Sequence, residues 1–458
     1  MVFSSSVFLL LFLPIVIAIY YNPLFKTRGF RNMFLIFASV VFYAWGEPVF
    51  VFIMFASIAI NWVLALKINK AKLIAAIILD LGLLFVFKYA NFVADNLGLL
   101  FLNTNSQSLI PKIALPIGIS FYTFQMLSYM IDVYKRKTGP QKNFFSCALY
   151  ISIFPALIAG PIIRYTDIEN QIINRKESWE DFCKGLKRFT FGLGKKLLIA
   201  NNCALAADAT FNSLNNGVQI GTAFAWLGAI AYTLQIFFDF SGYSDMAIGL
   251  GRMFGFKFME NFNYPYISAS ITEFWRRWHI SLSSWFRDYV YIPLGGSRVK
   301  KSRLFLNLFI VWLLTGIWHG ANWTFIVWGF GYFVFLALEK FALPVSKIPK
   351  PLAHIYTMLI VVCLWVVFRA NSLSEAADYL CIMGGKGNQL GNGDFWFYLN
   401  SLKLYLFLGI LFCFPIAKWL KPKFSYTLVS DFAYIILFSL CVMSVIKGGY
   451  NPFIYFNF

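Results

Sequence analysis

The sequence predicts an all-α integral membrane protein that crosses the bilayer many times, and three observations support this fold class. The 458-residue chain is 59% hydrophobic and 20% aromatic but only 13% charged, whereas soluble domains carry about 25% charged residues. Its apolar residues fall into blocks of the length that crosses the hydrocarbon core of a bilayer, roughly 20 residues. Short basic loops separate these blocks, which is typical of multi-pass membrane proteins.

Roughly ten to twelve membrane passes can be delimited in this way. The blocks lie at about 5–21, 33–66 (two passes, broken near 46–48), 73–88, 113–133, 144–163, 189–212, 222–250, 304–319, 321–343, 352–370, 402–420 and 431–447. The block at 144–163 contains Pro155, Gly160 and Pro161, so it is either an interrupted or re-entrant segment or a kinked ordinary span. The first block lacks a leading basic residue and a cleavage pattern, so we expect it to be the first span.

The net charge of +19 is assigned to orientation in the membrane rather than to nucleic-acid binding. The basic loops predicted to face the cytoplasm are 26–31, 67–72, 135–142, 164–188, 252–303, 347–350 and 418–423. The loops 91–110, 213–221 and 371–400 are poor in basic residues and are expected outside, together with both termini. The cations are also suited to meet anionic lipid headgroups or an anionic substrate.

The simplest organisation is one membrane domain over residues 1–458, because no internal repeat is visible. The seven cysteines are scattered and odd in number, which argues against a disulfide framework or a metal site. No zinc motif, nucleotide-binding loop, dinucleotide fingerprint or serine nucleophile elbow occurs. A hydrolase, an ATPase or an oxidoreductase therefore has no support from motifs.

The predicted cytoplasmic stretch 252–303 mixes tryptophans with arginines. Apolar residues recur at helical spacing from Glu273 to Tyr289, which predicts one amphipathic helix at the membrane interface, capped by Ser270 or Thr272. Two interpretations stay open: simple surface anchoring, or the floor of a cavity whose arginines face an anion. The arginines concerned are Arg276, Arg277, Arg287 and Arg298.

Three histidines occur in the chain. His319 lies in LLTGIWHGANW at the end of an apolar block, and an ionisable residue inside the membrane suggests function. It would serve as a general base; the alternative is a structural histidine that hydrogen-bonds between helices. His279, in FWRRWHIS, is either an interface residue or a second catalytic group, and His354 is expected to be incidental.

The C-terminal tail, residues 448–458, reads GGYNPFIYFNF. Gly448, Gly449 and Pro452 end the last predicted helix before it. Exposed aromatic rings are unfavourable, so the tail is expected to enter a groove or the interface. It is either part of an aromatic belt or a plug that lines a substrate tunnel.

Five long stretches resemble the membrane-bound O-acyltransferases, in particular their bacterial branch of alginate O-acetyltransferases, peptidoglycan O-acetyltransferase A and teichoic acid D-alanyl transferase. Together they cover most of residues 110–330. They are PIGISFYTFQMLSYMIDVYKRK (116–137), FPALIAGPIIRY (154–165), FFDFSGYSDMAIGLGRMFGF (237–256), NFNYPYISASITEFWRRWHISLSSWFRDYVYIPLGG (261–296) and TGIWHGANWTFIVWG (315–329).

This resemblance implies a ring of tilted transmembrane helices, with re-entrant or interfacial helices, around a central funnel. It implies a catalytic role for His319 and a second functional role for His279. The tail resembles a Phe-x-Tyr-x-x-Phe ending whose tyrosine, here Tyr455, would accept the acyl group. The expected donor is acetyl-CoA from the cytoplasm, with its phosphates near the four arginines named above. Trp318 and Asn322 are near enough in sequence to serve an oxyanion, although their placement is not predicted.

The expected function is O-acetylation of an exported polysaccharide at the bacterial inner membrane, with a periplasmic partner that passes the acetyl group on. Peptidoglycan is the first expectation for the acceptor; alginate or another exopolysaccharide, and D-alanyl transfer to teichoic acid, are the alternatives. A lipid or protein acyltransferase working on one leaflet is a further alternative. The non-enzymatic alternative is a transporter or flippase.

Overall fold

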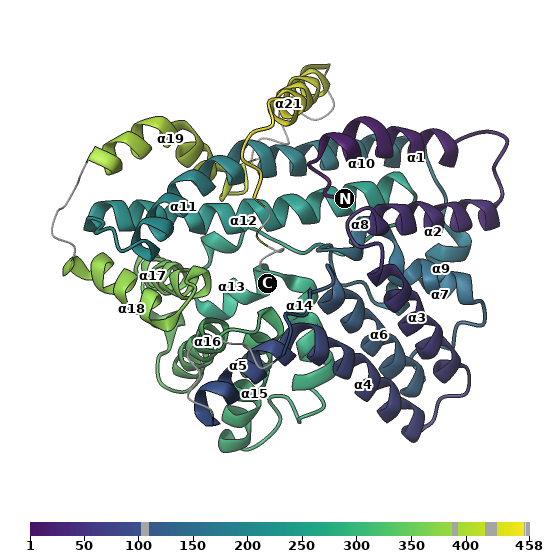
Figure 1. Cartoon of the computed structure of the whole chain (residues 1–458), viewed down its shortest axis with the longest axis horizontal. Helices are drawn as coiled ribbons and strands as arrows, with labels where there is room; N and C mark the ends of the chain where they lie inside the picture. Colours follow the sequence, from purple (N-terminus) through teal and green to yellow (C-terminus); the bar gives the residue numbers. More distant parts are fainter. Residues whose placement is uncertain (102–109, 387–392, 417–427, 453, 455–458) are drawn as a thin grey trace. The chain divides into compact units, whose positions relative to one another are not determined.

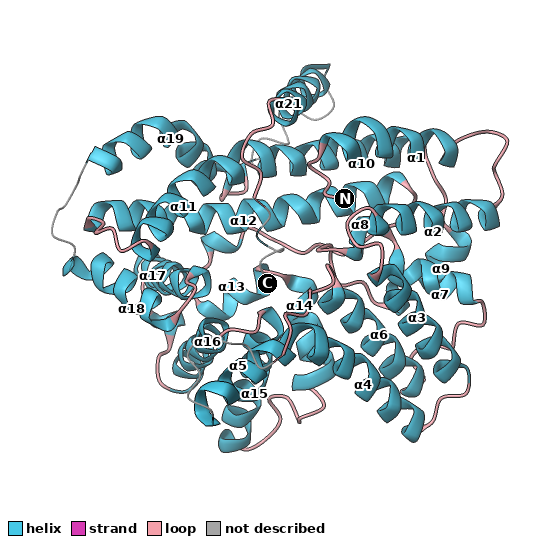
Figure 2. Ribbon diagram, in the orientation of Figure 1, coloured by secondary structure: helices cyan, strands magenta, loops and turns pink. Residues whose placement is uncertain are grey.

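The computed structural model describes residues 1–101, 110–386, 393–416, 428–452 and 454. Within these ranges the chain consists of helices joined by loops and turns, with no strand (Figure 2). Seven of the described helical segments are long and apolar enough to cross a membrane, and the shorter apolar helices Phe8–Tyr20 and Phe50–Leu66 accompany them. The prediction of an all-α, multi-pass membrane protein is confirmed.

The chain packs into two compact units. The first contains Met1–Phe189 and Ser244–Met259, and the second contains Thr190–Tyr243 and Glu260–Phe458. Two helices, α10 (Trp179–Gly194) and α12 (Thr222–Met253), contribute to both units (Figure 1). The single membrane domain expected from the sequence stays a prediction.

The first unit is built mainly from the N-terminal helices, which Figure 1 draws in purple and blue. In chain order they are η1 (Phe8–Phe12), α1 (Leu13–Tyr20), α2 (Arg28–Ala44), α3 (Phe50–Leu66), α4 (Lys70–Leu84), η2 (Phe85–Tyr89), α5 (Ala90–Phe101), α6 (Ile119–Tyr134), α7 (Phe144–Ser152), α8 (Phe154–Leu157) and α9 (Tyr165–Asn174).

The predicted break at 46–48 falls between α2 and α3. The weak block at 144–163 is interrupted at Ile153, two residues before Pro155, whose ring disfavours continuation of a helix.

One predicted loop in this unit is wrong. The span expected to end at residue 88 continues as helix to Leu99, so residues 91–99 are not a loop. The polar side chain of Asn91 lies within this helix, where it donates to the carbonyl of Pro111 and accepts from the backbone N–H of Ile113, both at 3.0 Å.

A buried ion-pair network joins the basic segment 164–188 to the start of the chain. The side chain of Arg175 is fully buried, lies over the ring of Phe256 at 4.2 Å and donates to the carbonyl of Phe254 at 3.1 Å. Glu177 accepts from Arg28 and pairs with Arg31 at 2.8 Å. Burial raises the pKa of Glu177, but Arg28, the hydroxyl of Tyr20 and Arg31 together lower it to about 2. This basic segment is therefore partly core and not only a solvated loop.

The second unit contains the remaining helices. In chain order they are η3 (Lys195–Ala200), α11 (Asn201–Asn215), η4 (Pro265–Ile267), α13 (Ile271–Arg277), α14 (Ile280–Phe286), η5 (Arg287–Tyr291), α15 (Lys301–His319), α16 (Trp323–Phe341), η6 (Val345–Lys347), α17 (Lys350–Arg369), α18 (Leu373–Cys381), η7 (Ile382–Lys386), α19 (Gly393–Phe412) and α21 (Leu428–Ile446).

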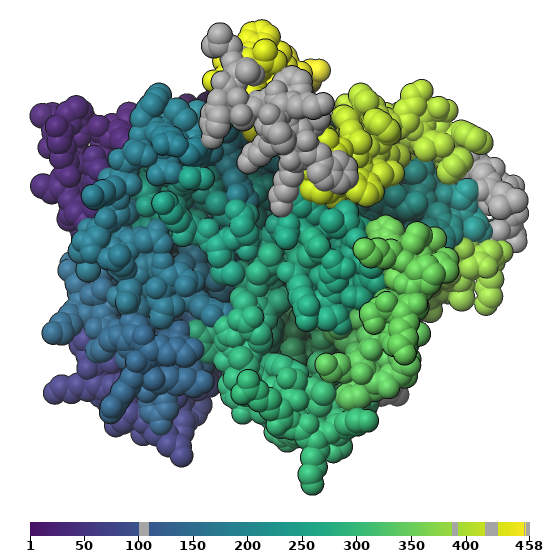
Figure 3. Space-filling view, turned by 180° about the vertical axis from the view of Figure 1, so that it is seen from behind, coloured from purple at the N-terminus to yellow at the C-terminus, as the bar shows by residue number. Residues whose placement is uncertain are grey.

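Helices α19 and α21 present exposed apolar side chains such as Phe407 and Ile435, and their yellow-green and yellow surfaces stand out in Figure 3. Such faces suit lipid contact.

Two sequence expectations in this unit are wrong. The single helix from Glu273 to Tyr289 is broken into α13, α14 and η5, because Trp278 is extended and His279 has a left-handed φ of 44°. Ser270 caps α13 as expected, and the side chain of Glu273 accepts from the backbone N–H of Ala269 at 3.0 Å. The span expected at 402–420 starts at Gly393, so the predicted outer loop 371–400 contains α18 and the beginning of α19.

Helices α15 and α16 form the tightest pair near the predicted catalytic histidine. A Cβ added at Gly316 would lie 2.5 Å from the carbonyl oxygen of Phe325, and one added at Gly329 would lie 2.5 Å from that of Trp312. Small residues allow backbones to approach closely in membranes. Asn322 then starts α16, because its side chain accepts from the backbone N–H of Thr324 at 3.1 Å.

Substitution of Gly316 by Ala should lower the free energy of unfolding by about 1–3 kcal/mol, because the added methyl group overpacks against backbone atoms. Thermal melting in detergent checks this. The matched control is Gly82→Ala in α4, where nothing lies within 4 Å of the added Cβ. Equal melting temperatures for the two variants would contradict the tight-packing interpretation.

Candidate functional site

His319 is the last residue of α15 and is 5% exposed. Three aromatic rings surround its imidazole, with centroid distances of 5.0 Å to Trp318, 4.9 Å to Trp328 and 5.2 Å to Phe368. All three contacts are edge-to-face. Such surroundings hold the imidazole in place and keep bulk water away from it.

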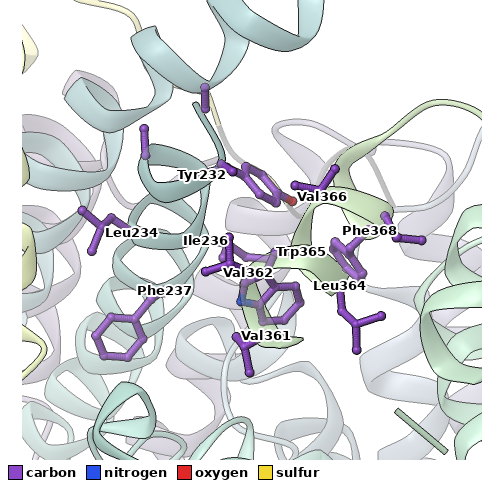
Figure 4. Close-up of a cluster of buried hydrophobic side chains, with 14 of the residues drawn as sticks. Tyr232, Leu234, Ile236, Phe237, Val361, Val362, Leu364, Trp365, Val366 and Phe368 are labelled. Atoms are coloured by element: carbon purple, nitrogen blue, oxygen red, sulfur yellow. The ribbon is translucent and has the colours of Figure 1, made fainter. Parts of the chain in front are cut away.

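This aromatic cage continues into the core of the second unit. Buried side chains of α12 and α17 face one another there, and Figure 4 shows the ring of Tyr232 extending from α12 toward α17. The ring of Trp365 lies 6.0 Å from that of Trp328, and the two are stacked. His319 is thus positioned by a rigid aromatic scaffold rather than by a loop.

His279 lies between α13 and α14 and is fully buried. Its Nδ1 is 3.2 Å from the side-chain oxygen of Asn261, which also accepts from Ser281 Oγ at 2.9 Å. Its ring packs against Phe240 at 4.6 Å. Burial lowers the pKa of His279 to about 3, so this imidazole is neutral at physiological pH.

The two histidines predicted to be functional both contact one indole ring. Trp318 contacts His279 at a centroid distance of 6.0 Å and His319 at 5.0 Å. Residues separated by 40 positions in the chain are therefore brought together at one site. The third histidine, His354, lies in α17, where its Nδ1 is 3.1 Å from the carbonyl oxygen of Ser268.

A polar pocket of about 470 Å³ lies beside the aromatic cage. Phe368, which contacts His319, forms part of its wall, as does Phe325. The hydroxyl of Tyr232 and the amide oxygen of Gln235 also line it, and neither atom has a hydrogen-bond partner among the described residues. Both side chains are more than nine-tenths buried. A cavity lined in this way is suited to a ligand with hydrogen-bonding groups.

An ion pair that the sequence reasoning missed completes the wall of this pocket. Arg369 donates to Asp208 Oδ1 at 2.7 Å, and the same guanidinium lies 6.0 Å from the centre of the Tyr232 ring. Both charged residues lie close to apolar blocks of the sequence. That position was a detectable signal, since ionisable residues at membrane depth usually mark a functional pathway.

The arginines predicted to bind an anion differ in their surroundings. Arg277 pairs with Glu273 at 2.8 Å and Arg287 pairs with Asp288 at 2.7 Å. Arg276 and Arg298 are exposed, and no ion pair is recorded for either within the described ranges. Arg276 and Arg298 are therefore the better candidates for an external anion.

The two groups considered for oxyanion stabilisation are now placed. Trp318 contacts both histidines, whereas the side chain of Asn322 caps α16 and donates to the carbonyl of Asn371 at 2.9 Å. Of the C-terminal tail, Tyr450, Pro452 and Ile454 line the polar pocket. Tyr455, predicted to accept the acyl group, lies outside the described residues.

These features define a multi-pass membrane protein with a caged histidine next to a polar pocket. Residues 63–383 match the model of MBOAT, the membrane-bound O-acyltransferase family, and the chain belongs to this family. It is therefore an O-acyltransferase, and the transporter alternative loses its support.

Three relatives illustrate the range of the family. The chain is 48% identical to the probable alginate O-acetylase of Pseudomonas aeruginosa over 390 residues, 82% of this chain and 73% of that protein. It is 35% identical to the peptidoglycan O-acetyltransferase of Helicobacter pylori over 432 residues, 84% and 80% of the two chains. The teichoic acid D-alanyltransferase of Bacillus subtilis is 29% identical over 235 residues, 49% of this chain and 59% of that protein.

The neutral state of buried His279 predicts a pH dependence of stability. Its pKa is about 3 in the folded chain and 6.5 ordinarily, so below pH 6.5 the unfolded chain binds a proton that the folded chain does not. The free energy of unfolding should fall between pH 6.5 and 3 by up to about 1.4 kcal/mol per pH unit.

Thermal melting of wild type and His279→Asn at pH 7.5 and 5.0 tests this, since Asn tolerates the left-handed backbone. The wild type should lose more stability on acidification than the variant. His354→Asn is the control and should behave as wild type. An unchanged pH dependence in His279→Asn would show that His279 is not the group responsible.

Proposed function

We propose that this chain transfers acetyl groups from cytoplasmic acetyl-CoA through the bacterial inner membrane, and that a periplasmic partner passes them to an exported polysaccharide. The names of the relatives at 48% and 35% identity support O-acetylation of a polysaccharide. The sequence alone favoured peptidoglycan. The higher identity to alginate O-acetylases puts alginate or a similar exopolysaccharide first, peptidoglycan second and D-alanyl transfer third.

The observation that carries this proposal is the position of His319. It is buried at the end of α15, and Phe368, whose ring contacts its imidazole, also lines a polar pocket. A base enclosed by aromatic rings can accept a proton while water, which would hydrolyse a thioester, is excluded. A structural histidine would need neither the pocket nor this enclosure.

In the proposed reaction His319 removes the proton from the phenol of Tyr455, whose ordinary pKa of about 10 makes such a base necessary. The phenolic oxygen attacks the thioester carbonyl, a C–O bond forms, and the C–S bond breaks. The thiolate of CoA leaves and takes up the proton held by His319. A hydroxyl group presented with the partner then attacks the tyrosyl ester. A new C–O bond forms, the bond to the tyrosine oxygen breaks, and the tyrosine takes up the proton that the hydroxyl loses.

Arg276 is the arginine best placed to bind the donor phosphates near the site. It belongs to α13, whose Trp275 lies 5.7 Å from the ring of Trp328, and Trp328 contacts His319. Arg298 precedes α15 and is therefore separated from His319 by the whole length of that helix.

His319→Ala should reduce thiol release from acetyl-CoA by purified protein about 10²- to 10⁴-fold, the usual contribution of a general base. The free thiol is measured with a chromogenic disulfide. His354→Ala is the matched control, because it removes a histidine that lies outside the aromatic cage, and it should keep wild-type release.

Equal thiol release by wild type and His319→Ala would make His319 structural and overturn the mechanism. Tyr455→Phe tests the acceptor separately. Loss of tail acetylation, read by mass spectrometry, together with loss of polysaccharide acetylation is expected. A fully active Tyr455→Phe would instead favour direct transfer, as in a lipid or protein acyltransferase.

Arg276→Ala should raise the KM for acetyl-CoA about tenfold, because one charge-assisted contact to phosphate is worth about 1.5–3 kcal/mol. Arg287→Ala is the matched control, since its guanidinium already pairs with Asp288. Steady-state kinetics with acetyl-CoA give both values. Equal KM values for the two variants would exclude Arg276 from donor binding.

A further inference from the structure

A lysine and an aspartate are buried together in the second unit, and the mechanism above does not use them. Lys196 in η3 and Asp239 in α12 are each 2% exposed at the side chain, and Nζ lies 2.8 Å from Oδ1. A buried ion pair is a costly way to join two helices, because desolvation offsets most of the attraction. Helix association alone therefore gives no reason for this pair.

The C-terminal tail completes the hydrogen bonding of this pair. Lys196 Nζ donates to the backbone carbonyl of Pro452, and the backbone N–H of Ile454 donates to Asp239 Oδ2 at 2.9 Å. Lys196 Nζ also donates to Asn201 Oδ1 at 2.8 Å, and Asn201 Nδ2 donates to Asn451 Oδ1 at 3.2 Å. The tail is thus bound through its backbone at two points and through a side chain at a third.

The same arrangement recurs at the polar pocket. Asp208 uses Oδ1 for Arg369 at 2.7 Å and Oδ2 for the hydroxyl of Tyr450 at 2.6 Å. In both pairs the cation holds one carboxylate oxygen and the tail occupies the other. Two such anchors, four residues apart in the tail, fix which tail residue lies at which carboxylate.

We propose that Lys196 and Asp239 are positioning residues that hold the tail in one register for acyl transfer, an inference that rests on the proposed function. Ile454, whose backbone N–H donates to Asp239, lines the polar pocket beside the aromatic cage, and Tyr455 is the next residue in the chain. Fixing the backbone of Ile454 limits the positions open to the tyrosine hydroxyl. Small misplacements of a reacting group are costly, up to about 100-fold in rate.

The test compares Asp239→Asn, the double variant Lys196→Met with Asp239→Leu, and the control Lys195→Met. Asparagine keeps the shape of Asp239 but loses the charge that holds Lys196, whereas the double variant leaves no buried charge unpaired. Lys195 is the neighbouring lysine; its Nζ donates to Ser241 Oγ at 3.5 Å and lies over the rings of Phe191 and Phe237. Melting temperatures identify any variant that fails to fold.

Two measurements are made on the full-length protein in detergent. Hydrogen exchange of the C-terminal peptide should be about tenfold faster in Asp239→Asn and in the double variant than in wild type and Lys195→Met. The kcat for acetyl-CoA-dependent acetylation of Tyr455 should fall about 10- to 100-fold in the same two variants, with KM for acetyl-CoA unchanged. A pair that only stabilised the fold would not lower kcat while leaving the KM for acetyl-CoA unchanged.

Slow exchange in folded Asp239→Asn would overturn the anchoring, and fast exchange with unchanged kcat would overturn the positioning role. Absence of Tyr455 acetylation in wild type would instead defeat the proposed function. The exchange data would then still decide whether Lys196 and Asp239 anchor the tail, so the two failures are distinguishable.

Discussion

Every charge within the apolar segments must find its counter-charge or hydrogen-bond partners inside the protein, because lipid supplies none. Lys196 meets Asp239 and Arg369 meets Asp208 across helices that are distant in sequence. In the first unit, Asp80 in α4 accepts from Asn61 of α3 at 2.8 Å. These pairings fix which helix faces meet, since a rotated helix would leave a buried charge alone at a cost of several kcal/mol.

The site divides the work between an apolar and a polar compartment. Around His319 the neighbours are aromatic, and they exclude water from the imidazole. The neighbouring pocket, of which Phe368 also forms part of the wall, is lined by polar and charged groups, including Asp208 and Arg369. A thioester donor and a hydroxyl acceptor have these opposite requirements, and Phe368 contacts both environments.

Hydropathy predicted the fold class and most spans, because lipid imposes long apolar runs, and the resemblance of the long motifs singled out His279 and His319. The break at His279 escaped prediction, since its left-handed backbone depends on Asn261, 18 residues away. The Lys196–Asp239 pair was equally hidden. Its partners lie on different helices, and periodicity within one helix carries no information about contacts between helices.

The geometry of α15 bears on how an acyl group would cross the membrane. Arg298 lies just before the helix and His319 ends it, and 18 residue steps at 1.5 Å give about 27 Å between its ends. If the arginine side is cytoplasmic, the base lies near the opposite side of the bilayer. A donor whose phosphates stay on the cytoplasmic side would then extend only its thioester arm toward His319, so the proposed acetyl transfer would need no transport of the charged nucleotide. The burial of His319 and the polar pocket beside it are what such a transfer requires.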